Sequence, residues 1–202
     1  MIKANTEKVK KLFDRPILVR TKETEWDRRV KLTNSFPTIE PAADGNSLEL
    51  RDRLFPVMPF PNSRLSDVVI NAATGEEELV RIYNRPTWAP GFKAERCLVV
   101  MTSFFEPAYW GSEAGTVQEF SSNEDEILLV AAIKIKPIKP ATGQRDAVSL
   151  LTHVPSEFML QYHQRLLVFL KPDAGVEWIS GGAVGGNTDP QKKFDFLLAN
   201  RH

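Results

Sequence analysis

Cysteine is almost absent from this chain, since Cys97 is the only one among its 202 residues. A single cysteine excludes an internal disulfide and any zinc site built from several thiolates. Long apolar runs are also missing: the longest cover 97–101 and 127–133, far short of the roughly 20 residues that span a bilayer. Residues 1–13 carry four lysines and no apolar stretch, so we expect no secretory leader. We therefore expect a cytoplasmic protein with no membrane and no metal partner.

The chain has no net charge either, because 26 Lys and Arg balance 26 Asp and Glu. Bulk charge is therefore not expected to hold long duplex DNA or an acidic membrane surface. A local basic groove is compatible with this balance, since residues 1–31 hold ten basic against five acidic side chains. That local excess is either a solvated surface or a phosphate-binding region, and the sequence leaves both open.

The pattern of strand and helix signals predicts an α+β domain. Apolar runs rich in β-branched or aromatic residues predict strands at 68–70, 96–105, 126–135, 147–153 and 166–170. Segments rich in proline or polar residues predict loops between short strands at 32–63 and hairpin loops at 110–125 and 138–146. Short helices are expected behind the N-caps Asn5 and Ser156, the first ending at Pro16, with a last helical turn at 194–198. We predict one monomeric domain over 1–202: a curved, mostly antiparallel sheet with a barrel-like core and short peripheral helices.

The sequence has no phosphate-binding loop, dinucleotide fingerprint or nucleophile elbow. Only a few side chains are therefore candidates for a catalytic or ligand-binding role. Glu106 ends an apolar strand, where apolar neighbours raise a carboxyl pKa toward the range of general acid–base catalysis. It can equally be a surface glutamate. His163 lies where the short helix meets the next strand, two residues before Arg165, so both side chains can face one cleft. Asn71 follows a strand and is either a turn residue or a ligand for a phosphate or sugar oxygen.

Taken in order, these pieces resemble the SRAP family, the SOS-response-associated peptidases. The segments that carry the resemblance are N-A at Asn71, R-C-L-V followed by F-F-E, E-I-L-L-V-A-A-I, L-L-T-H-V-P, H-x-R-L and E-W-I. They run from 36 to 178, about 70% of the chain. No single segment is specific, and F-F-E followed by H-x-R some 57 residues later is the stronger signal.

The resemblance implies a function in shielding abasic sites in single-stranded DNA. In the family the initiator methionine is removed, the α-amine of the exposed cysteine condenses with the sugar aldehyde, and the thiol closes a thiazolidine ring. Carried over to this chain, the resemblance implies that Glu106 promotes sugar ring opening and proton transfer, and that His163 donates and accepts a proton near the sugar oxygen. It also implies contacts with the DNA backbone or groove from Asn71, Arg81, Arg165 and Pro37, the last in a loop. No cofactor is implied.

The chain departs from the family where the nucleophile should be. The family begins M-C-G-R, whereas this chain begins Met1-Ile2-Lys3-Ala4, and the bulky Ile2 should block removal of Met1. Ala73 replaces the arginine of the family's N-A-R, and Pro107 replaces an aromatic residue after the glutamate. Two explanations stay open. Translation starts upstream at a Met-Cys, which the in-frame codons would decide, or the chain is a divergent, phage-borne branch.

These observations lead to one expected function and one alternative. The expected function is to bind single-stranded DNA at abasic sites and to protect or process them in the DNA-damage response. The stable crosslink lacks its thiol, but a Schiff base through the Met1 amine with lyase cleavage is open if the terminus reaches the cleft. The alternative is a non-catalytic interaction or DNA-binding module whose site has decayed. A hydrolase is disfavoured because no second carboxylate follows Glu106 at a recognisable spacing.

Overall fold

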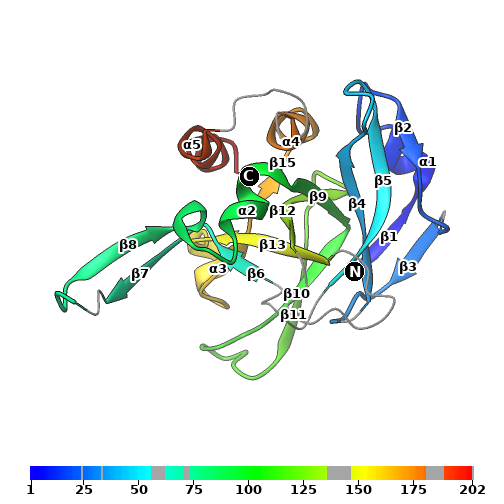
Figure 1. The fold of residues 1–202 in the computed structure, drawn as a ribbon. Helices are drawn as coiled ribbons and strands as arrows, with labels where there is room; N and C mark the ends of the chain where they lie inside the picture. Colours follow the sequence, from blue (N-terminus) through cyan, green and yellow to red (C-terminus); the bar gives the residue numbers. More distant parts are fainter. Residues whose placement is uncertain are drawn as a thin grey trace.

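The structure is a computed structural model that describes residues 1–23, 25–32, 34–55, 62–70, 73–135, 147–180 and 189–201. Asn71 and the predicted loop at 138–146 therefore lie outside the described residues. Figure 1 shows a barrel at the centre, two helices along one side of it, and a two-stranded hairpin that projects from the body. The predicted α+β class is confirmed.

The barrel is one sheet whose strands close into a ring. Its strands are β2 (Ile17–Val19), β4 (Ser35–Pro41), β5 (Leu48–Leu54), β6 (Asn62–Arg64), β9 (Arg96–Met101), β12 (Leu128–Ile135), β13 (Ala147–His153), β14 (Leu166–Leu167) and β15 (Phe169–Leu170). They follow the order β14-β13-β12-β9-β4-β5-β2, with β15 on β12 and β6 on β13. A parallel bridge between Ala147 of β13 and Leu54 of β5 closes the ring, whereas β4, β5, β9, β12 and β13 otherwise pair antiparallel within it.

Three two-stranded sheets surround the barrel. They are β1 (Ile2–Asn5) with β3 (Glu25–Arg28), β10 (Ser103–Pro107) with β11 (Val117–Ser121), and β7 (Ser66–Ile70) with β8 (Glu77–Arg81). The β7–β8 pair is the projecting hairpin of Figure 1. The strand predicted at 68–70 is therefore present, and it lies in this exposed hairpin rather than in the barrel. A short apolar run looks the same in a buried strand and in an exposed one.

The helices are short, as predicted, and lie at the periphery. They are α1 (Thr6–Lys10), η1 (Ile82–Asn84), α2 (Ala89–Ala94), α3 (Glu157–Leu160), α4 (Pro172–Ile179) and α5 (Pro190–Asn200). Both predicted N-caps are confirmed: the Lys8 N–H donates to Asn5 Oδ1 (2.9 Å), and the Met159 N–H donates to Ser156 Oγ (3.3 Å). However, α1 ends well before Pro16, and α5 has eleven residues rather than one turn. None of the described helices is long and apolar enough to cross a membrane.

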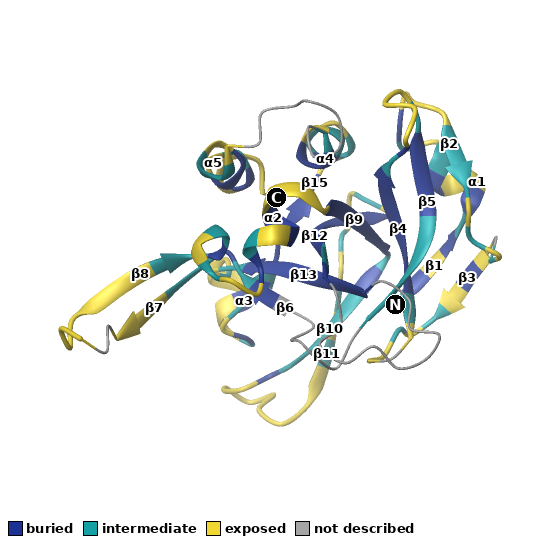
Figure 2. Ribbon diagram, in the orientation of Figure 1, coloured by how far each residue is buried: buried dark blue, intermediate teal, exposed yellow. Residues whose placement is uncertain are grey.

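Figure 2 shows that the buried residues are concentrated in the strands of the barrel, and the core cluster also includes Trp178 and Ile179 of α4. Every described residue of β9 is buried, Cys97 included. Trp178 of α4 is also fully buried and donates its indole N–H to the Cys97 carbonyl (3.1 Å). Burial raises the pKa of the Cys97 thiol well above its ordinary value, so this thiol is a core group and not a nucleophile.

The segment 32–63, predicted as loops between short strands, contains β4 and β5, two paired strands of seven residues each, so strands occupy more of it than expected. Pro37 lies inside β4, opposite Asp52 of β5, and is buried. The other neighbour, β9, pairs only with Thr38 and Ile39. The missing N–H of Pro37 thus falls outside that second ladder, which is where a sheet tolerates proline. The predicted loop at 110–125 likewise contains β11, whose exposure alternates along the strand.

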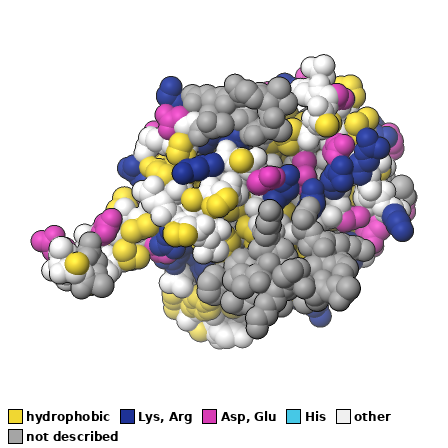
Figure 3. Space-filling view, in the orientation of Figure 1, with side chains coloured by type: hydrophobic (Ala, Val, Ile, Leu, Met, Phe, Trp, Pro, Cys, Tyr) yellow, Lys and Arg dark blue, Asp and Glu magenta, His cyan; other side chains and the backbone are white. Residues whose placement is uncertain are grey.

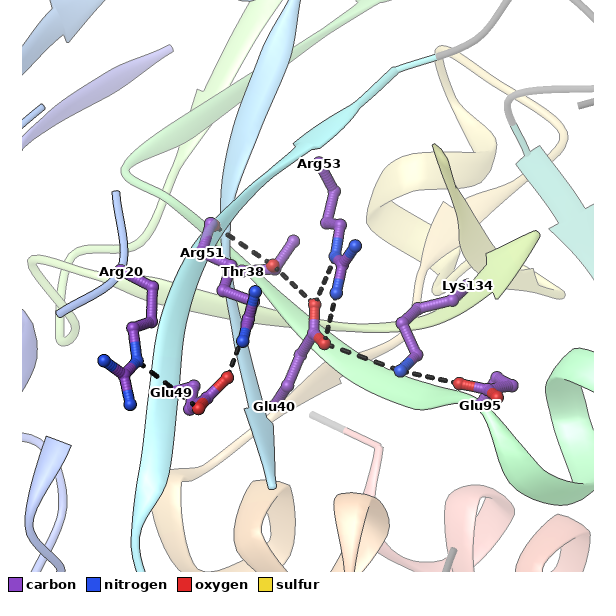
Figure 4. Close-up of polar contacts among 8 residues, drawn as sticks. All are labelled: Arg20, Thr38, Glu40, Glu49, Arg51, Arg53, Glu95 and Lys134. Atoms are coloured by element: carbon purple, nitrogen blue, oxygen red, sulfur yellow. Dashed lines mark hydrogen bonds and ion pairs between the residues drawn. The ribbon is translucent and has the colours of Figure 1, made fainter. Parts of the chain in front are cut away.

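A buried ion network ties three strands of the barrel together (Figure 4). The Glu40 carboxylate of β4 is 4% exposed and accepts from Arg53 Nε (2.6 Å) and Nη2 (2.8 Å) on β5. The Thr38 hydroxyl also donates to it (3.1 Å), and Lys134 Nζ of β12 lies 3.5 Å away. Burial acts to raise the pKa of Glu40, but Arg53, Lys134 and Thr38 outweigh it and hold that pKa below its ordinary value. The carboxylate is therefore charged in the folded protein at neutral pH.

Candidate functional site

A cavity of about 450 Å³ lies where the chain terminus meets β10. Met1 and Glu106 both line it, together with the basic residues Arg29 and Lys31. Its remaining lining comes from Ser103 and from apolar or backbone groups of Val30, Phe36, Phe55, Met101, Phe104, Phe105, Leu150 and Leu167. An amine, a carboxyl group and two cations therefore share one partly apolar cavity.

Backbone contacts fix the Met1 α-amine in this cavity. The amine donates to the Ser103 carbonyl (2.7 Å), and the N–H groups of Thr102 and Ser103 donate to the Met1 carbonyl (3.0 and 3.4 Å). The following residue, Ile2, is fully buried, and β1 pairs with β3. Hydrogen bonds to its amine and its carbonyl, together with the buried side chain of Ile2, thus hold Met1 in place.

Burial lowers the pKa of the Met1 amine below its ordinary value. Arg29 acts in the same direction, whereas the carboxylate of Glu119 on β11 opposes it. Glu119 accepts a hydrogen bond from the Ser103 hydroxyl (2.5 Å), on the residue whose carbonyl receives the amine. A lowered pKa leaves more of the amine unprotonated at neutral pH, and the unprotonated form is the nucleophile.

Glu106 and His163 form the second part of the site. Glu106 lies on β10, and His163 follows α3; the Oε2 and Nε2 atoms are 3.5 Å apart, with side chains 19% and 3% exposed. Burial raises the pKa of Glu106, although the positive charges of His163 and Arg165 oppose the rise. The backbone of Arg165 holds the other ring nitrogen, Nδ1, and the Tyr109 ring packs on the imidazole at 4.7 Å. This is the arrangement of a carboxyl–imidazole pair that can exchange a proton.

Arg165 connects this pair to a second cavity of about 350 Å³. Its charge acts on Glu106, and the residue lines the second cavity with Arg64, Arg85, Asp67, Ser63, Trp88 and Gln164. Asp67 pairs with Arg64 (2.9 Å) and Arg85 (3.1 Å). The Nε atom of Arg165 is buried without a hydrogen-bond partner among the described residues. Three guanidinium groups against one carboxylate make this cavity a candidate site for phosphate.

The structure brings four of the predicted site residues together and separates two. Met1, Glu106, His163 and Arg165 form one continuous region. Arg81 instead lies at the base of the hairpin, where it donates to Gln191 of α5 (2.6 Å) and its guanidinium packs on Phe194. Pro37 is buried in β4 rather than in a groove-lining loop, for the reason given above.

Sequence reasoning missed Arg64, Arg85 and Glu119. The local sequence gives no distinctive signal for any of them. Arg85 follows η1 in an N-R-P segment that reads as an ordinary turn, and Glu119 lies in a segment predicted as a loop. Within the part of the chain that the structure describes, no three His, Cys, Asp or Glu side chains gather in a way that could hold a metal ion.

Two exposed aromatic side chains stand beside the site. Tyr109 and Trp110 are both about half exposed, with their ring centroids 5.9 Å apart. Trp110 is held by its indole N–H, which donates to the Leu160 carbonyl (2.7 Å). Exposed aromatic rings of this kind provide surfaces on which unpaired bases stack.

Comparisons with known proteins agree with this architecture. The family model described as SOS response associated peptidase (SRAP) matches residues 2–197. A crystal structure of a protein from Bordetella bronchiseptica matches with a TM-score of 0.62 and 16% identity, over 98% of this chain and 92% of that one. A phage-related protein from the same organism matches with a TM-score of 0.59 and 17% identity, over 90% of this chain and 79% of that one. A protein from Bacteroides thetaiotaomicron matches with a TM-score of 0.58 and 16% identity, over 82% of this chain and 68% of that one. A search of curated protein sequences finds no match.

Proposed function

The chain belongs to the SRAP family, and from that premise we propose that it binds single-stranded DNA at an abasic site and forms a Schiff base through the Met1 amine. Family membership gives the DNA-damage-related role in general terms. The observation that carries the specific proposal is that Met1, whose amine is held by the Ser103 carbonyl, and Glu106 line the same cavity, with His163 Nε2 3.5 Å from the Glu106 carboxyl group.

The proposed reaction follows from the protonation states of these groups. The unprotonated Met1 amine attacks the aldehyde carbon of the ring-opened sugar, and a C–N bond forms. Glu106, whose raised pKa keeps more of it protonated, gives its proton to the departing hydroxyl, so water leaves and the imine remains. The Glu106 carboxylate, with His163 as its proton partner, then removes a proton from the adjacent sugar carbon, and the 3′-phosphate leaves. Water hydrolyses the remaining imine and frees the amine.

The adduct proposed for this chain is reversible. A thiazolidine ring needs a thiol next to the reacting amine, but the only cysteine, Cys97, is fully buried in β9. The imine therefore has no internal trap, and only an added reductant makes it permanent. This separates the proposed chemistry from the crosslink that the family resemblance implies.

The second cavity supplies the proposed phosphate contacts. Arg165, Arg64 and Arg85 line it, and Arg165 also acts on Glu106, so a phosphate held there lies beside the reacting sugar. Tyr109 and Trp110 offer stacking surfaces for neighbouring bases. A short groove with a few basic contacts accounts for DNA binding by a chain with no net charge, and it predicts only a shallow dependence of affinity on salt.

The test is reductive trapping on a single-stranded oligonucleotide that carries one abasic site. The chain, with Met1 verified by intact mass, is incubated with and without borohydride and run on a denaturing gel. We expect a shifted band only in the reduced samples and slow strand cleavage in the others. Glu106→Gln should lower the rate about 10²- to 10⁴-fold, the usual contribution of general acid–base catalysis, while Glu113→Gln, an exposed control, should not.

Failure of this test has a defined meaning. If neither trapping nor cleavage occurs but the abasic oligonucleotide raises the melting temperature more than an intact one, the protein binds the site without chemistry. If the oligonucleotide has no effect on melting, the chain is an interaction module with a decayed site, and the proposal is wrong.

A further inference from the structure

The projecting hairpin β7–β8 has an apolar face that nothing in the described chain covers. Val68, Ile70 and Leu79 are 59%, 63% and 58% exposed. Val68 lies directly opposite Leu79, and Ile70 lies directly opposite Glu77, so these four side chains share one face, which is apolar except for Glu77 at the end of the hairpin. In Figure 3 this arm stands clear of the body, with acidic side chains along it. A two-stranded hairpin alone is at best marginally stable in water, and three or more strands with an apolar face are needed.

The two edges of the arm differ in charge. The outer edge of β8 carries Glu77 and Glu78, and charges on an edge strand oppose pairing with another chain. The only charged residue of β7 is Asp67, whose carboxylate is already paired with Arg64 and Arg85. Charge therefore does not oppose pairing of another strand with the free edge of β7.

We propose that β7 pairs antiparallel with β7 of a second copy of this chain, which joins two arms into a four-stranded sheet. Pairing about a twofold axis through Val68 places Val68 opposite its own copy, Asp67 opposite Val69, and Ser66 opposite Ile70. No like charges face each other in this register. The shared face then holds six exposed apolar side chains instead of three. Glu77 and Glu78 of each copy lie on the two outer strands, where their charges oppose pairing with further chains.

Charge and symmetry select this occupant over others. The glutamates of β8 repel a nucleic acid backbone, so the arm is not a second DNA contact. Pairing of β7 with β8 of another copy would leave free edges at both ends and would propagate into fibres; the charges on β8 oppose it. This proposal replaces the monomer expected from the sequence and does not depend on the abasic-site chemistry.

The first experiment is sedimentation equilibrium of the full chain over a range of concentrations. We expect a reversible dimer of twice the 22.8 kDa chain mass. Val68→Lys should raise the dimer dissociation constant about tenfold or more, because it brings two charges face to face. Val154→Lys is the matched control, since Val154 is exposed outside the arm. A monomer at every concentration, or a dimer that Val68→Lys leaves intact or that Val154→Lys weakens equally, overturns the proposal.

The second experiment tests the register independently of stability. Residues directly opposite each other on antiparallel strands have Cβ atoms about 4.5–5.5 Å apart, close to disulfide distance after small adjustments. Val68→Cys should therefore form an intermolecular disulfide under mild oxidation, visible on a non-reducing gel. Val154→Cys should not, and the native Cys97 is buried and cannot contribute. Equal crosslinking of both variants, or of neither, contradicts the twofold pairing through Val68.

Discussion

A single glycine placed before Met1 should abolish the proposed Schiff base. The present amine is fixed by its hydrogen bond to the Ser103 carbonyl at 2.7 Å, and the Met1 carbonyl is held by the N–H groups of Thr102 and Ser103. Adding one residue turns the Met1 nitrogen into an amide and moves the new amine by up to about 3.8 Å. The amide is not nucleophilic, so only the displaced amine can react.

The size of the effect follows from this displacement. A misplacement of about 1 Å can cost a reacting group on the order of 100-fold in rate, so a shift several times larger should reduce trapping by at least about 100-fold. The new amine also leaves the buried position that lowers the pKa of the Met1 amine. More of it is therefore protonated at neutral pH, which adds to the loss.

The assay is the single-turnover rate of reductive trapping on the abasic oligonucleotide, compared between the native and extended chains. The extension is built with a protease site so that cleavage regenerates Met1 on the same sample. Restoration of the rate after cleavage excludes misfolding as the cause. If the extended chain is trapped at the native rate, the Met1 amine is not the nucleophile. The reacting amine would then be that of a lysine, and Lys31 lines the cavity.

Three further predictions follow from the same structure. Glu40→Ala should lower the free energy of unfolding by about 3–5 kcal/mol in urea at neutral pH, because it removes the buried carboxylate that Arg53 contacts with two nitrogens; a loss no larger than that of the exposed Glu7→Ala contradicts this. Because the pKa of Glu40 is held low, the difference should shrink as pH falls through that lowered pKa. Glu119→Gln removes the charge that raises the pKa of the Met1 amine, so the pH profile of trapping should move to lower pH, and an unmoved midpoint excludes this influence. Arg165→Ala should weaken binding to the abasic oligonucleotide and reduce the slope of log affinity against log salt concentration by about one. Native Arg81 is bound to Gln191 of α5, so Arg81→Ala should change neither quantity.

The sequence predicted best where the local pattern is decisive. Strand β13 and the two N-caps match their predicted positions, because continuous apolar runs and capping side chains act over a few residues. Glu106 and His163 were each candidates because of their positions at the ends of elements, and the resemblance to the SRAP family is what implied that they act together. Their separation of 3.5 Å depends on β10 and the segment after α3 lying side by side, which no local pattern encodes.

The parts of the site that the sequence could not place depend on contacts between distant segments. Met1 reaches the cavity only because β1 pairs with β3 and because backbone groups next to β10 hold its carbonyl. Arg85 and Arg165 are far apart in the sequence, yet both line the second cavity. The prolines at 32–63 favoured loops with only short strands, although in β4 Pro37 falls where the ladder does not need an N–H, so a strand of seven residues forms. Long-range pairing decided each of these positions.

The carboxylate of Asp67 has a consequence for how the two ends of the molecule communicate. Asp67 belongs to β7 of the projecting arm, yet its two oxygens hold Arg64 and Arg85 at the wall of the second cavity. The arm and the cavity thus share one anion. A phosphate bound in the second cavity would compete with Asp67 for the guanidinium groups of Arg64 and Arg85. Phosphate binding and the proposed pairing of β7 would then share one side chain, and any coupling between them would be reciprocal.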